Sequence, residues 1–532
     1  MKSLFWGDSI IDDFLKEYGD EAGKRKLILR DEKTLSGRPH VGSLRSFVMH
    51  AILSDVLTSR DVDNVFYYEI NDTDAFDSVP SYVPSEWKEH LGKRLKDVPS
   101  PDGKAENYAM YFAKEYTDAL VDSMYNSEFY VSSHKYEAGE YDKYIRLALD
   151  NKDKIREIYK EVSGSVKDEN WYPCQVVCDK CGKIATTVIT GWDGKEVEYS
   201  CSADVGYTRG CGHKGVKSPF GGHATMPWKV EWAAKFCVME VDLEGAGKDH
   251  YAAGGSRHVS NRICVEVFGH KHPFDVRHEF ILMGGAKMSS SSGVGATAVE
   301  LEGLLPLYIF RFMMIQKDVM KTISFDPSGD TIPVLFDQYD EVCKDYFHGG
   351  EDVKEHKNRI FEFTHFYEKD LKKFDRFLPR FSHIAFYVQM PHVDIKAKVE
   401  EMKGEKLTEA DIEEMNFRIE YAKKWLDTCS PEKYIFKVQE EVPETAGELS
   451  GEQKKFLGLL ADFLEGNVNA KGEDIQGFIH EQKVELEMQP MDIFKSIYIS
   501  ILGKESGPQA GWLIEALEKV FLIDRFQKVS KL

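Results

Sequence analysis

Residues 26–70 combine two short apolar runs with one helix-like stripe of apolar positions. The run Lys26–Leu29 is typical of a buried strand, and Val65–Ile70 is typical of a second one. Between them a loop rich in Gly and Pro leads into a helix, whose apolar face would consist of Leu44, Phe47, Val48, Ala51, Ile52 and Val56. The pattern predicts a strand–loop–helix–strand unit with polar side chains at the carboxyl ends of its strands.

The same periodicities divide the rest of the chain. Residues 80–225 interrupt the α/β pattern with helical stretches at about 104–125 and 141–162. The α/β pattern resumes near Trp228, and from about residue 346 onward the pattern is almost entirely helical. We therefore predict the first half of an α/β domain (1–85), an insertion (86–225), the second half (226–300), a helical connector (301–345) and an all-α domain (346–532).

Composition agrees with several globular domains. A chain of 532 residues is too long for one core, and 42% hydrophobic with 30% charged residues is an ordinary balance. No apolar run approaches the roughly 18–20 residues that span a membrane, so no membrane partner is expected. Acidic residues soon follow the N-terminus, at Asp8, Asp12 and Asp13, so no secretory or transit peptide is apparent and a cytoplasmic location is expected.

The net charge of −21 is only weak evidence about whether the chain binds RNA. Basic patches are the usual mark of a nucleic-acid-binding protein, so the charge alone argues against an RNA partner. A local basic face within an acidic chain is still compatible with one.

Five of the nine cysteines crowd into residues 174–211, which in a cytosolic chain favours a bound metal over disulfides. One Cys-x2-Cys half and one stretched Cys-x9-Cys half suit a tetrahedral structural Zn²⁺. The expected ligands are Cys178, Cys181, Cys201 and Cys211, with His213 as the alternative fourth ligand. Cys174 is expected to be a bystander, and the competing interpretation is a set of reduced, buried cysteines without metal.

Two loops of the α/β halves have the residues of a nucleotide site. The first, Ser36–Ser43, places His40 where a helix begins, and backbone N–H groups there favour anions. The second, Gly285–Gly293, places Lys287 among small and hydroxyl residues, which suits a mobile clamp on a pyrophosphate. Each loop alone has an ordinary interpretation, a capped helix start and a flexible surface loop. There is no GxxxxGK[ST] run, so a Walker-type ATPase is not indicated.

Together, Pro39-His40-Val41-Gly42-Ser43 and Lys287-Met288-Ser289-Ser290-Ser291 resemble the HIGH and KMSKS signatures of class I aminoacyl-tRNA synthetases, and the serine-rich form most resembles class I lysyl-tRNA synthetase. The resemblance implies a Rossmann-type catalytic domain with a zinc-bearing insertion, followed by an all-α anticodon-binding domain. It implies that His40 and Lys287 are catalytic and stabilise the phosphates. The implied ATP-binding residues are Ser36, Gly37, His40, Gly42, Ser43, Asp249, Lys287, Met288, Ser289 and Ser290.

The chain departs from the family pattern at a few positions. Asp31–Gly37 replaces the usual TGxxPSG run before the histidine, in a loop that lines the amino-acid pocket of the family. Ser43 replaces the last histidine of HIGH, and Ser292 stands where a lysine often follows. Ser290 replaces the second lysine of KMSKS, as it does in class I lysyl enzymes.

The amino-acid pocket is expected around two further segments. Gly247–His250 with Gly254–Ser256 resembles the KDH…GGS segment of the lysyl family, and Trp228–Trp232 resembles a WxxDW-type strand. A tryptophan face with carboxylates suits a long cationic side chain. The implied amino-acid-binding residues are Glu32, Asn71, Asp72, Asp74, Trp228, Glu231 and His250. Taken alone, the two tryptophans are more typical of core packing, and the carboxylates at 72 and 74 could belong to a solvated loop.

The resemblance also implies cofactors and partners. We expect ATP as substrate, Mg²⁺, and one structural Zn²⁺, because residues 99–104 lack the Cys and His residues with which some archaeal relatives build a second metal site. Lysine and tRNA(Lys) are the expected partners, and a monomer is expected. In the helical tail, Tyr434, Phe436 or Trp512 could stack on unpaired bases, although core packing is the commoner role of any one of them.

The sequence thus predicts a lysine–tRNA ligase that forms lysyl-adenylate and passes the lysyl group to the terminal adenosine of tRNA. Another class I synthetase of glutamyl or glutaminyl type, and a synthetase-like adenylating paralogue, are the alternative enzymes. A zinc-bearing scaffold or RNA-binding protein without activity would require both nucleotide motifs to be accidental.

Overall fold

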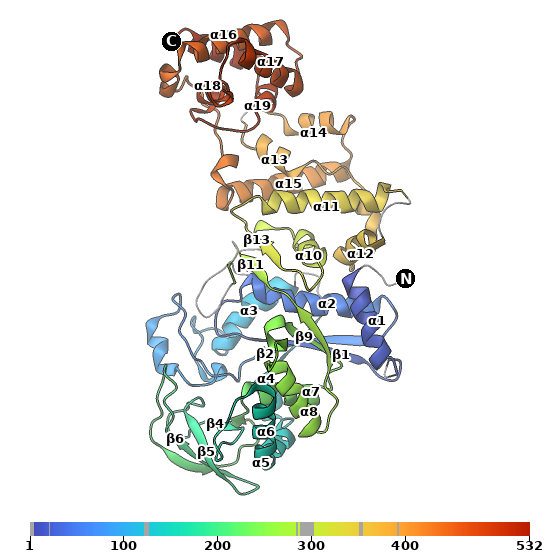
Figure 1. Ribbon diagram of the computed structural model, residues 1–532, viewed down its shortest axis with the longest axis vertical. Helices are drawn as coiled ribbons and strands as arrows, with labels where there is room; N and C mark the ends of the chain where they lie inside the picture. Colours follow the sequence, from blue (N-terminus) through green and yellow to red (C-terminus); the bar gives the residue numbers. More distant parts are fainter. Residues whose placement is uncertain are drawn as a thin grey trace. The chain divides into compact units, whose positions relative to one another are not determined.

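The computed structural model describes residues 5–20, 22–121, 127–283, 286–287, 303–350, 355–390 and 393–532. The chain forms two compact units. Unit 1 comprises residues 1–325 and 348–369, and unit 2 comprises residues 326–347 and 370–532 (Figure 1). Residues 326–345, which lie in the segment expected to be a connector, therefore belong to unit 2, whereas residues 348–369 belong to unit 1.

A five-stranded parallel sheet forms the centre of unit 1. Its strands are β1 (Leu27–Thr34), β2 (Asn64–Asn71), β3 (Glu128–Val131), β9 (Leu243–Gly247) and β10 (Phe274–His278). Their spatial order is β3-β2-β1-β9-β10, so the chain builds outward from β1 in both directions, as in a doubly wound Rossmann sheet. Figure 1 shows β1, β2 and β9 side by side, and the predicted Rossmann-type fold is confirmed.

Helix α2 (Leu44–Thr58) packs on this sheet, as the apolar stripe predicts, and α1 (Trp6–Tyr18) packs against α2. The helix is buried on almost every side rather than on one face. Its inward polar side chains are satisfied: Nε2 of His50 accepts a hydrogen bond from the backbone N–H of Gly245 at 2.8 Å, and Asp55 pairs with Arg311. The helix therefore acts as a fully enclosed support for the loop that precedes it.

The insertion carries small sheets and helices. The strands β5 (Thr187–Trp192), β6 (Val197–Cys201) and β7 (Lys214–Lys217) form an antiparallel sheet, and β4 (Gln175–Val176) pairs with β8 (Ala224–Thr225). The remaining elements between residues 80 and 225 are η2 (Ser85–His90), η3 (Leu95–Asp97), α3 (Tyr108–Val121), α4 (Ser132–Glu137), α5 (Asp142–Asp150) and α6 (Lys152–Ser163). Strand β3, in the same stretch, joins the central sheet.

The second α/β half completes unit 1. Helices α7 (Trp228–Val238) and α8 (Ser256–Glu266) pack against each other, and the short helix η4 (Lys248–Tyr251) follows β9. A small sheet pairs β11 (Ile281–Met283) with β12 (Ala286–Lys287) and with β13 (Ile323–Phe325). The other elements are η1 (Val41–Ser43), α10 (Leu307–Ile315) and α12 (Glu355–Thr364). The expected connector thus contains a strand as well as helices.

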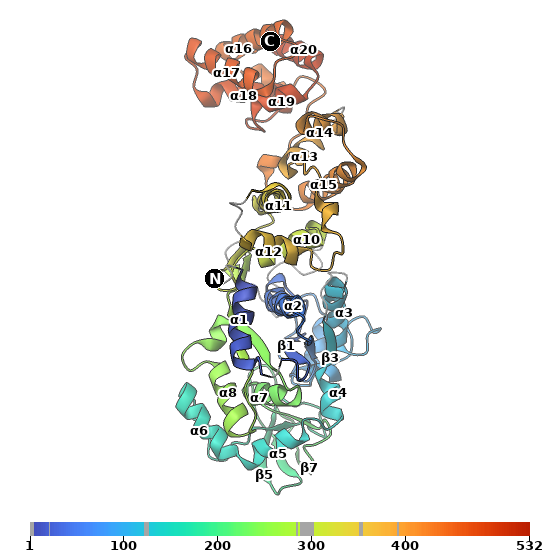
Figure 2. The same cartoon turned by 90° about the vertical axis from the view of Figure 1, so that its right-hand side faces the viewer.

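Unit 2 is helical throughout its described residues, and the predicted all-α tail is confirmed (Figure 2). Its elements are α11 (Thr331–His348), η5 (Leu371–Phe374), α13 (Phe381–Tyr387), α14 (Ile395–Lys403), α15 (Glu409–Thr428), η6 (Glu432–Tyr434), η7 (Glu444–Glu448), α16 (Gly451–Gly466), α17 (Gly472–Glu485), α18 (Pro490–Leu502), α19 (Ala510–Ala516) and α20 (Lys519–Ser530). Leucine and isoleucine from α16, α18 and α20 fill its largest core. Across both units, no helix in the described ranges has the length and apolar character needed to cross a bilayer.

Candidate functional site

The strand order indicates a ligand position at the carboxyl ends of β1 and β9. In doubly wound sheets, ligands bind where neighbouring strands lead their chains to opposite sides, and β1 and β9 are that pair here. The loop with His40 follows β1, and the segment with Asp249 and His250 follows β9. Two segments chosen from sequence motifs therefore meet at the position that the topology selects for a ligand.

His40 stands directly before the helical turn η1, which runs into α2. Its backbone is extended (φ −89°, ψ 155°), and its carbonyl accepts hydrogen bonds from the backbone N–H and the hydroxyl of Ser43 at 2.9 and 2.7 Å. The Ser36 carbonyl accepts a hydrogen bond from the Tyr108 hydroxyl at 3.1 Å. The loop is thus anchored at both ends beside the start of a long helix, where an anion is stabilised.

Lys287 lies in a short hairpin next to this loop. Its backbone pairs with Leu282 of β11 in an antiparallel ladder, and β11 contacts η1. The segments of His40 and Lys287 are thus neighbours in unit 1 although they are far apart in the sequence. Met288, Ser289 and Ser290 lie outside the described residues.

Further candidate residues lie at the carboxyl ends of β9 and β10. The Nδ1 atom of His250 and the Ser256 hydroxyl, at the start of α8, are 2.8 Å apart. His278, the last residue of β10, is buried, and its Nε2 atom has no hydrogen-bond partner within the described structure. Burial lowers the pKa of His278 to about 4, so the ring is neutral at pH 7 beside Asp249 and His250. The sequence analysis did not include His278. A histidine at the carboxyl end of a strand could have been chosen as a candidate site residue on that ground.

The segment Trp228–Trp232 is the first turn of helix α7, so the predicted strand is wrong. The four-residue spacing of the two tryptophans puts both rings on one face of a helix, and Pro227 directly precedes that helix. The rings stack with centroids 5.9 Å apart, and the His250 ring meets both edge-on. Trp232 is buried, as core packing predicts, whereas Trp228 is 49% exposed and forms an aromatic surface.

Carboxylates from separate segments surround one buried lysine of α7. The Nζ atom of Lys235 lies 2.7 Å from Oε2 of Glu32, 2.8 Å from Oε1 of Glu69 and 3.5 Å from Oε2 of Glu231. Asp74 belongs to the same group, because its charge interacts with Lys235, Glu32 and Glu69. Glu32 is the most accessible of the three carboxylates in contact with Lys235, with 31% of its side chain exposed.

A second buried cation, Arg30, belongs to the same group. It pairs with Glu69 at 2.5 Å, with Glu244 at 2.6 Å and with Glu32. The four carboxylates of Glu32, Glu69, Glu231 and Asp74 thus face two cations, Lys235 and Arg30. If all ionise, the group has an excess of negative charge, and Arg30 is shared further with Glu244. We call these six side chains the acidic pocket.

The pKa values of the acidic pocket reflect burial, which favours protonated carboxyl groups, and the two cations, which oppose it. Burial alone would raise the pKa of Glu69, but Lys235 and Arg30 lower it to about 2. Burial raises the pKa of Glu231 to about 7, with a further contribution from the charge of Asp74, even though Lys235 opposes the rise. Burial also raises the pKa of Asp74. Lys235 and Arg30 therefore keep Glu69 ionised, but they do not offset the effect of burial on the pKa values of Glu231 and Asp74.

The three predicted pocket residues at the carboxyl end of β2 differ in their surroundings. Asn71 and Asp72 are buried and bonded within the protein: Asp72 accepts from the backbone N–H and the hydroxyl of Ser133 at 2.9 and 2.7 Å, at the start of α4. Asn71 accepts from the backbone and the hydroxyl of Thr73. Asp74 is only partly buried and accepts from Thr34 at 2.5 Å. Asp74 is therefore the member of the predicted trio that belongs to the acidic pocket.

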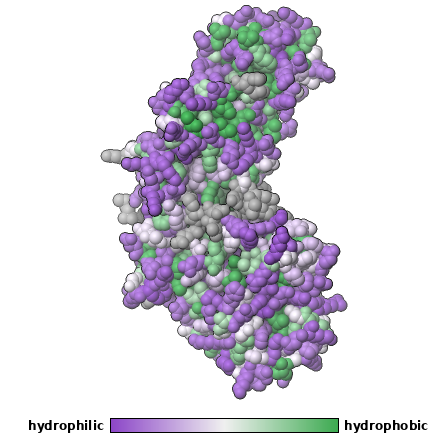
Figure 3. Space-filling view, turned by 180° about the vertical axis from the view of Figure 1, so that it is seen from behind, coloured by the Kyte–Doolittle hydropathy of each residue, from purple (hydrophilic) through white to green (hydrophobic). Residues whose placement is uncertain are grey.

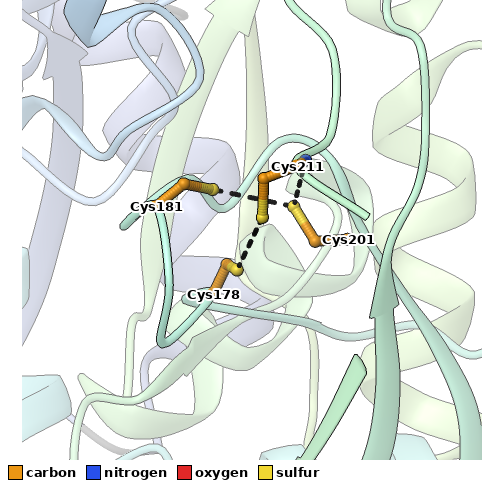
Figure 4. A group of neighbouring side chains, drawn as sticks. All are labelled: Cys178, Cys181, Cys201 and Cys211. Atoms are coloured by element: carbon orange, nitrogen blue, oxygen red, sulfur yellow. Dashed lines mark hydrogen bonds between the residues drawn. The ribbon is translucent and has the colours of Figure 1, made fainter. Parts of the chain in front are cut away.

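The expected metal ligands converge in the insertion. Figure 4 shows the side chains of Cys178, Cys181, Cys201 and Cys211 pointing toward one another. Their sulfur atoms all lie within 4.8 Å of one another, and the Cys178–Cys211 and Cys181–Cys201 pairs are 3.7 Å apart. Four sulfurs about 2.3 Å from a central Zn²⁺ stand about 3.8 Å apart, so the group fits a zinc ion.

His213 and Cys174 are outside the four-cysteine group. His213 contributes its backbone N–H, which lowers the pKa of the Cys211 thiol to about 7. Cys174 is buried in a hydrophobic core that the insertion shares with α7 and α8. The geometry thus favours Cys211 over His213 as the fourth ligand.

Comparisons with known proteins show the family of the chain. The family described as tRNA synthetases class I (K) matches residues 4–367. A lysine–tRNA ligase of Methanosarcina barkeri is 30% identical over 99% of this chain and 98% of its own length. Another of Thermoplasma acidophilum is 30% identical over the full length of both chains. Among solved structures, a glutamate tRNA ligase of Elizabethkingia meningosepticum has a TM-score of 0.41 and 15% identity over 95% of this chain and 99% of its own.

Proposed function

The chain belongs to the class I tRNA synthetases of the (K) family, and from this membership we propose that it is a lysine–tRNA ligase. The resemblance to class I lysyl-tRNA synthetases is confirmed. The observation that best supports lysine as the substrate is the acidic pocket beside an exposed tryptophan, at the carboxyl end of the central sheet. The amino-acid dependence of ATP–pyrophosphate exchange, which closes the Discussion, tests the proposal.

The proposed reaction has two steps. The α-carboxylate of lysine attacks the α-phosphorus of ATP, the bond to the β-phosphate oxygen breaks, and pyrophosphate leaves. The terminal adenosine of tRNA then attacks the lysyl carbonyl through its 2′-hydroxyl, and AMP leaves. His40 donates a hydrogen bond to the phosphates, Lys287 neutralises charge on the departing pyrophosphate, and Mg²⁺, when bound, shields the same oxygens. Positioning and electrostatics provide most of the acceleration.

The acidic pocket suits a substrate with two ammonium groups. Burial raises the pKa of Glu231 and Asp74 even though Lys235 opposes the rise, so the resident cations do not fully compensate these two carboxylates. A bound lysine supplies the missing positive charge, while the exposed face of Trp228 covers its methylene chain. A glutamate side chain would instead add a carboxylate to this group, and a glutamine side chain would leave its charge uncompensated. The electrostatics therefore favour lysine over the glutamyl and glutaminyl alternatives.

We expect the affinity for lysine to fall below about pH 7. A cation favours the ionised form of Glu231, so lysine binding to the protonated site must release a proton. Affinity is complete above about pH 7 and weakens by up to about tenfold per pH unit below it. The KM for lysine in ATP–pyrophosphate exchange, measured from pH 6 to 8, checks this.

The variant Glu231→Gln should weaken lysine binding and flatten its pH dependence. Glu140→Gln, at an exposed position paired with Lys135, is the matched control and should keep the wild-type profile. An unchanged pH profile in Glu231→Gln would show that Glu231 does not contribute to lysine binding. The KM for ATP in the same assays reports whether the effect is specific to lysine.

Unit 2 offers a surface for tRNA. A pocket of about 660 Å³ lies among residues of α13, η6 and the segment before α19, and Tyr434, Phe436 and Trp512 all line it. Arg380 and Lys433, two exposed cations that pair with Asp337 and Asp330, stand at the same pocket. On the face shown in Figure 3, hydrophobic side chains also gather over part of unit 2. Aromatic rings beside cations suit unpaired bases and their phosphates, so we assign this pocket to the anticodon of tRNA(Lys).

Trp512→Ala should raise the KM for tRNA(Lys) in aminoacylation by about tenfold, because stacking on one base contributes roughly 1–3 kcal/mol. The rate of tRNA-independent pyrophosphate exchange should not change. Trp512→Phe keeps a stacking surface and is the matched control, for which we expect a smaller effect. Equal tRNA affinity in wild type and Trp512→Ala would rule out this role for Trp512.

The four-cysteine group is proposed to hold one structural Zn²⁺. With four sulfurs around the ion no position is open to a substrate, so the ion would hold the insertion together rather than take part in the reaction. A cytoplasmic location, a monomeric state and the use of Mg²⁺ stay predictions.

A further inference from the structure

A second group of metal-ligating side chains lies in unit 1, apart from the four cysteines. Cys237 is near the end of α7, Cys264 is near the end of α8, and His270 is in the loop between α8 and β10. One ligand atom of each residue lies within 4.8 Å of the others. Both cysteines are buried and the histidine is partly exposed. None of the three side chains has a part in the adenylation chemistry.

The backbone holds His270 beside Cys264. Helix α8 ends with N–H groups of Val267 and Phe268 both bonded to the carbonyl of Ile263, at 3.0 and 3.1 Å. Gly269 then turns the chain with φ +69°, a conformation that favours glycine. The N–H of His270 returns to the carbonyl of Cys264 at 3.0 Å. The approach of the imidazole to the thiol is therefore set by the helix end.

The geometry of the group matches that of a metal centre. The sulfur atoms of Cys237 and Cys264 are 3.7 Å apart, the same spacing as in the four-cysteine group and close to the 3.8 Å or so expected around Zn²⁺. The Nδ1–H of His270 donates to the carbonyl of Lys271 at 2.7 Å. Metal-bound histidines usually bond the backbone or a carboxylate in this way, which leaves Nε2 with a lone pair for the ion.

The charge and chemical type of the three ligands indicate which class of metal ion they would bind. Two thiolates and one neutral imidazole are soft or borderline ligands, which suit Zn²⁺ and similar transition metals rather than Mg²⁺ or Ca²⁺. Two thiolates also neutralise a divalent ion, so the complex would carry no net charge into a buried site. A monovalent ion would leave a buried negative charge. The partly exposed His270 provides the side from which an ion can enter.

We propose that Cys237, Cys264 and His270 bind a second, thiolate-preferring divalent metal ion of the Zn²⁺ class, with a water molecule in the fourth position. The ion would join the ends of α7 and α8 to the loop that enters β10. Trp228 and Glu231 are on α7, and Ser256, which contacts His250, begins α8. The metal would therefore fix the two helices that carry the amino-acid pocket.

Metal content of the full chain tests the proposal. Protein purified without chelator and dialysed should contain two zinc ions per chain. Cys237→Ala and Cys201→Ala should each contain one, from the four-cysteine group and from the new site respectively. Cys174→Ala, a buried cysteine outside both groups, is the matched control and should keep two. Equal zinc content in wild type and Cys237→Ala would overturn the proposal.

A second measurement covers variants that fail to fold. His270→Ala changes a partly exposed loop residue and should lose the second zinc to a competing chelator while the first stays bound. In the wild-type protein, Zn²⁺ should protect Cys237 and Cys264 from alkylation, mapped by mass spectrometry, and leave buried Cys343 of unit 2 unaffected. Alkylation of Cys237 and Cys264 that does not depend on zinc, or a disulfide between them in freshly purified protein, would contradict a metal site.

Discussion

Replacing His40 with alanine lowers the rate of lysine-dependent ATP–pyrophosphate exchange by about 100-fold, with little change in folding. The size follows from the cost of removing one preorganised donor to a charge that develops in the transition state. His40 stands before η1 and α2, so the helix start to which we assign phosphate binding remains when its ring is removed. We expect the loss in kcat more than in the KM for ATP, because the charge on the phosphates grows as pyrophosphate departs.

Lys287→Ala should cause a loss of similar size, since its hairpin lies beside the same loop. The control is His223→Ala, the same substitution at an exposed position between β7 and β8, which should retain the wild-type rate. Wild-type exchange in both His40→Ala and Lys287→Ala would refute the assignment of the ATP site. A loss of exchange accompanied by a loss of helical circular dichroism would indicate misfolding. In that case, ATP binding by the folded fraction of the variant would test the assignment of the ATP site.

The second large effect concerns the stability of unit 1. Replacing Arg30 with methionine should lower the free energy of unfolding by about 3 kcal/mol, because it removes the cation that Glu69 and Glu244 share. The loss is at the lower end for a broken buried pair, since Glu69 keeps Lys235 and Glu244 keeps Arg257. Arg30 is fully buried, so water cannot compensate for the loss. The destabilisation should diminish at low pH, where the carboxylates of Glu69 and Glu244 in the variant become protonated. Guanidinium unfolding at pH 7.5 and pH 5 measures both effects.

Arg262→Met is the matched control. Arg262 pairs with Glu266 and Glu161 on the surface of the same unit, and exposed pairs contribute at most about 1 kcal/mol. We expect the control to unfold close to the wild type. Similar stability of Arg30→Met and Arg262→Met would show that the acidic pocket is not held by its buried cations.

Local patterns in the sequence predicted the parts of the fold that depend on neighbouring residues. The apolar run at 65–70 lies within β2, and the stripe between the two runs forms α2. The run at 26–29 includes the start of β1, but the strand continues to Thr34, so the loop expected from Asp31 is wrong for residues 31–34. The cysteine spacing predicted the four-cysteine group because both pairs lie in one small insertion. In contrast, Trp228–Trp232 was predicted as a strand, since its match to a strand motif obscured a spacing that equally fits a helix.

Sites built from distant segments could not be predicted in this way. Glu32, Glu69 and Glu231 converge on Lys235 from two strands and a helix, and no spacing in the chain relates them. Cys237, Cys264 and His270 meet only because α7 packs against α8 and the helix end turns back. Similarly, Asn71, Asp72 and Asp74 look alike in the sequence, but only the packing of α4 shows that Asp72 is bonded internally.

The most direct test of the central claim is ATP–pyrophosphate exchange with each of the twenty amino acids, with and without tRNA. We predict exchange with lysine alone, since the four carboxylates of the acidic pocket face only two cations within it. A signal that requires tRNA would still agree with the account, because the adenylate is the same. Exchange driven by glutamate or glutamine, or no exchange with any amino acid in the presence of tRNA, would contradict it.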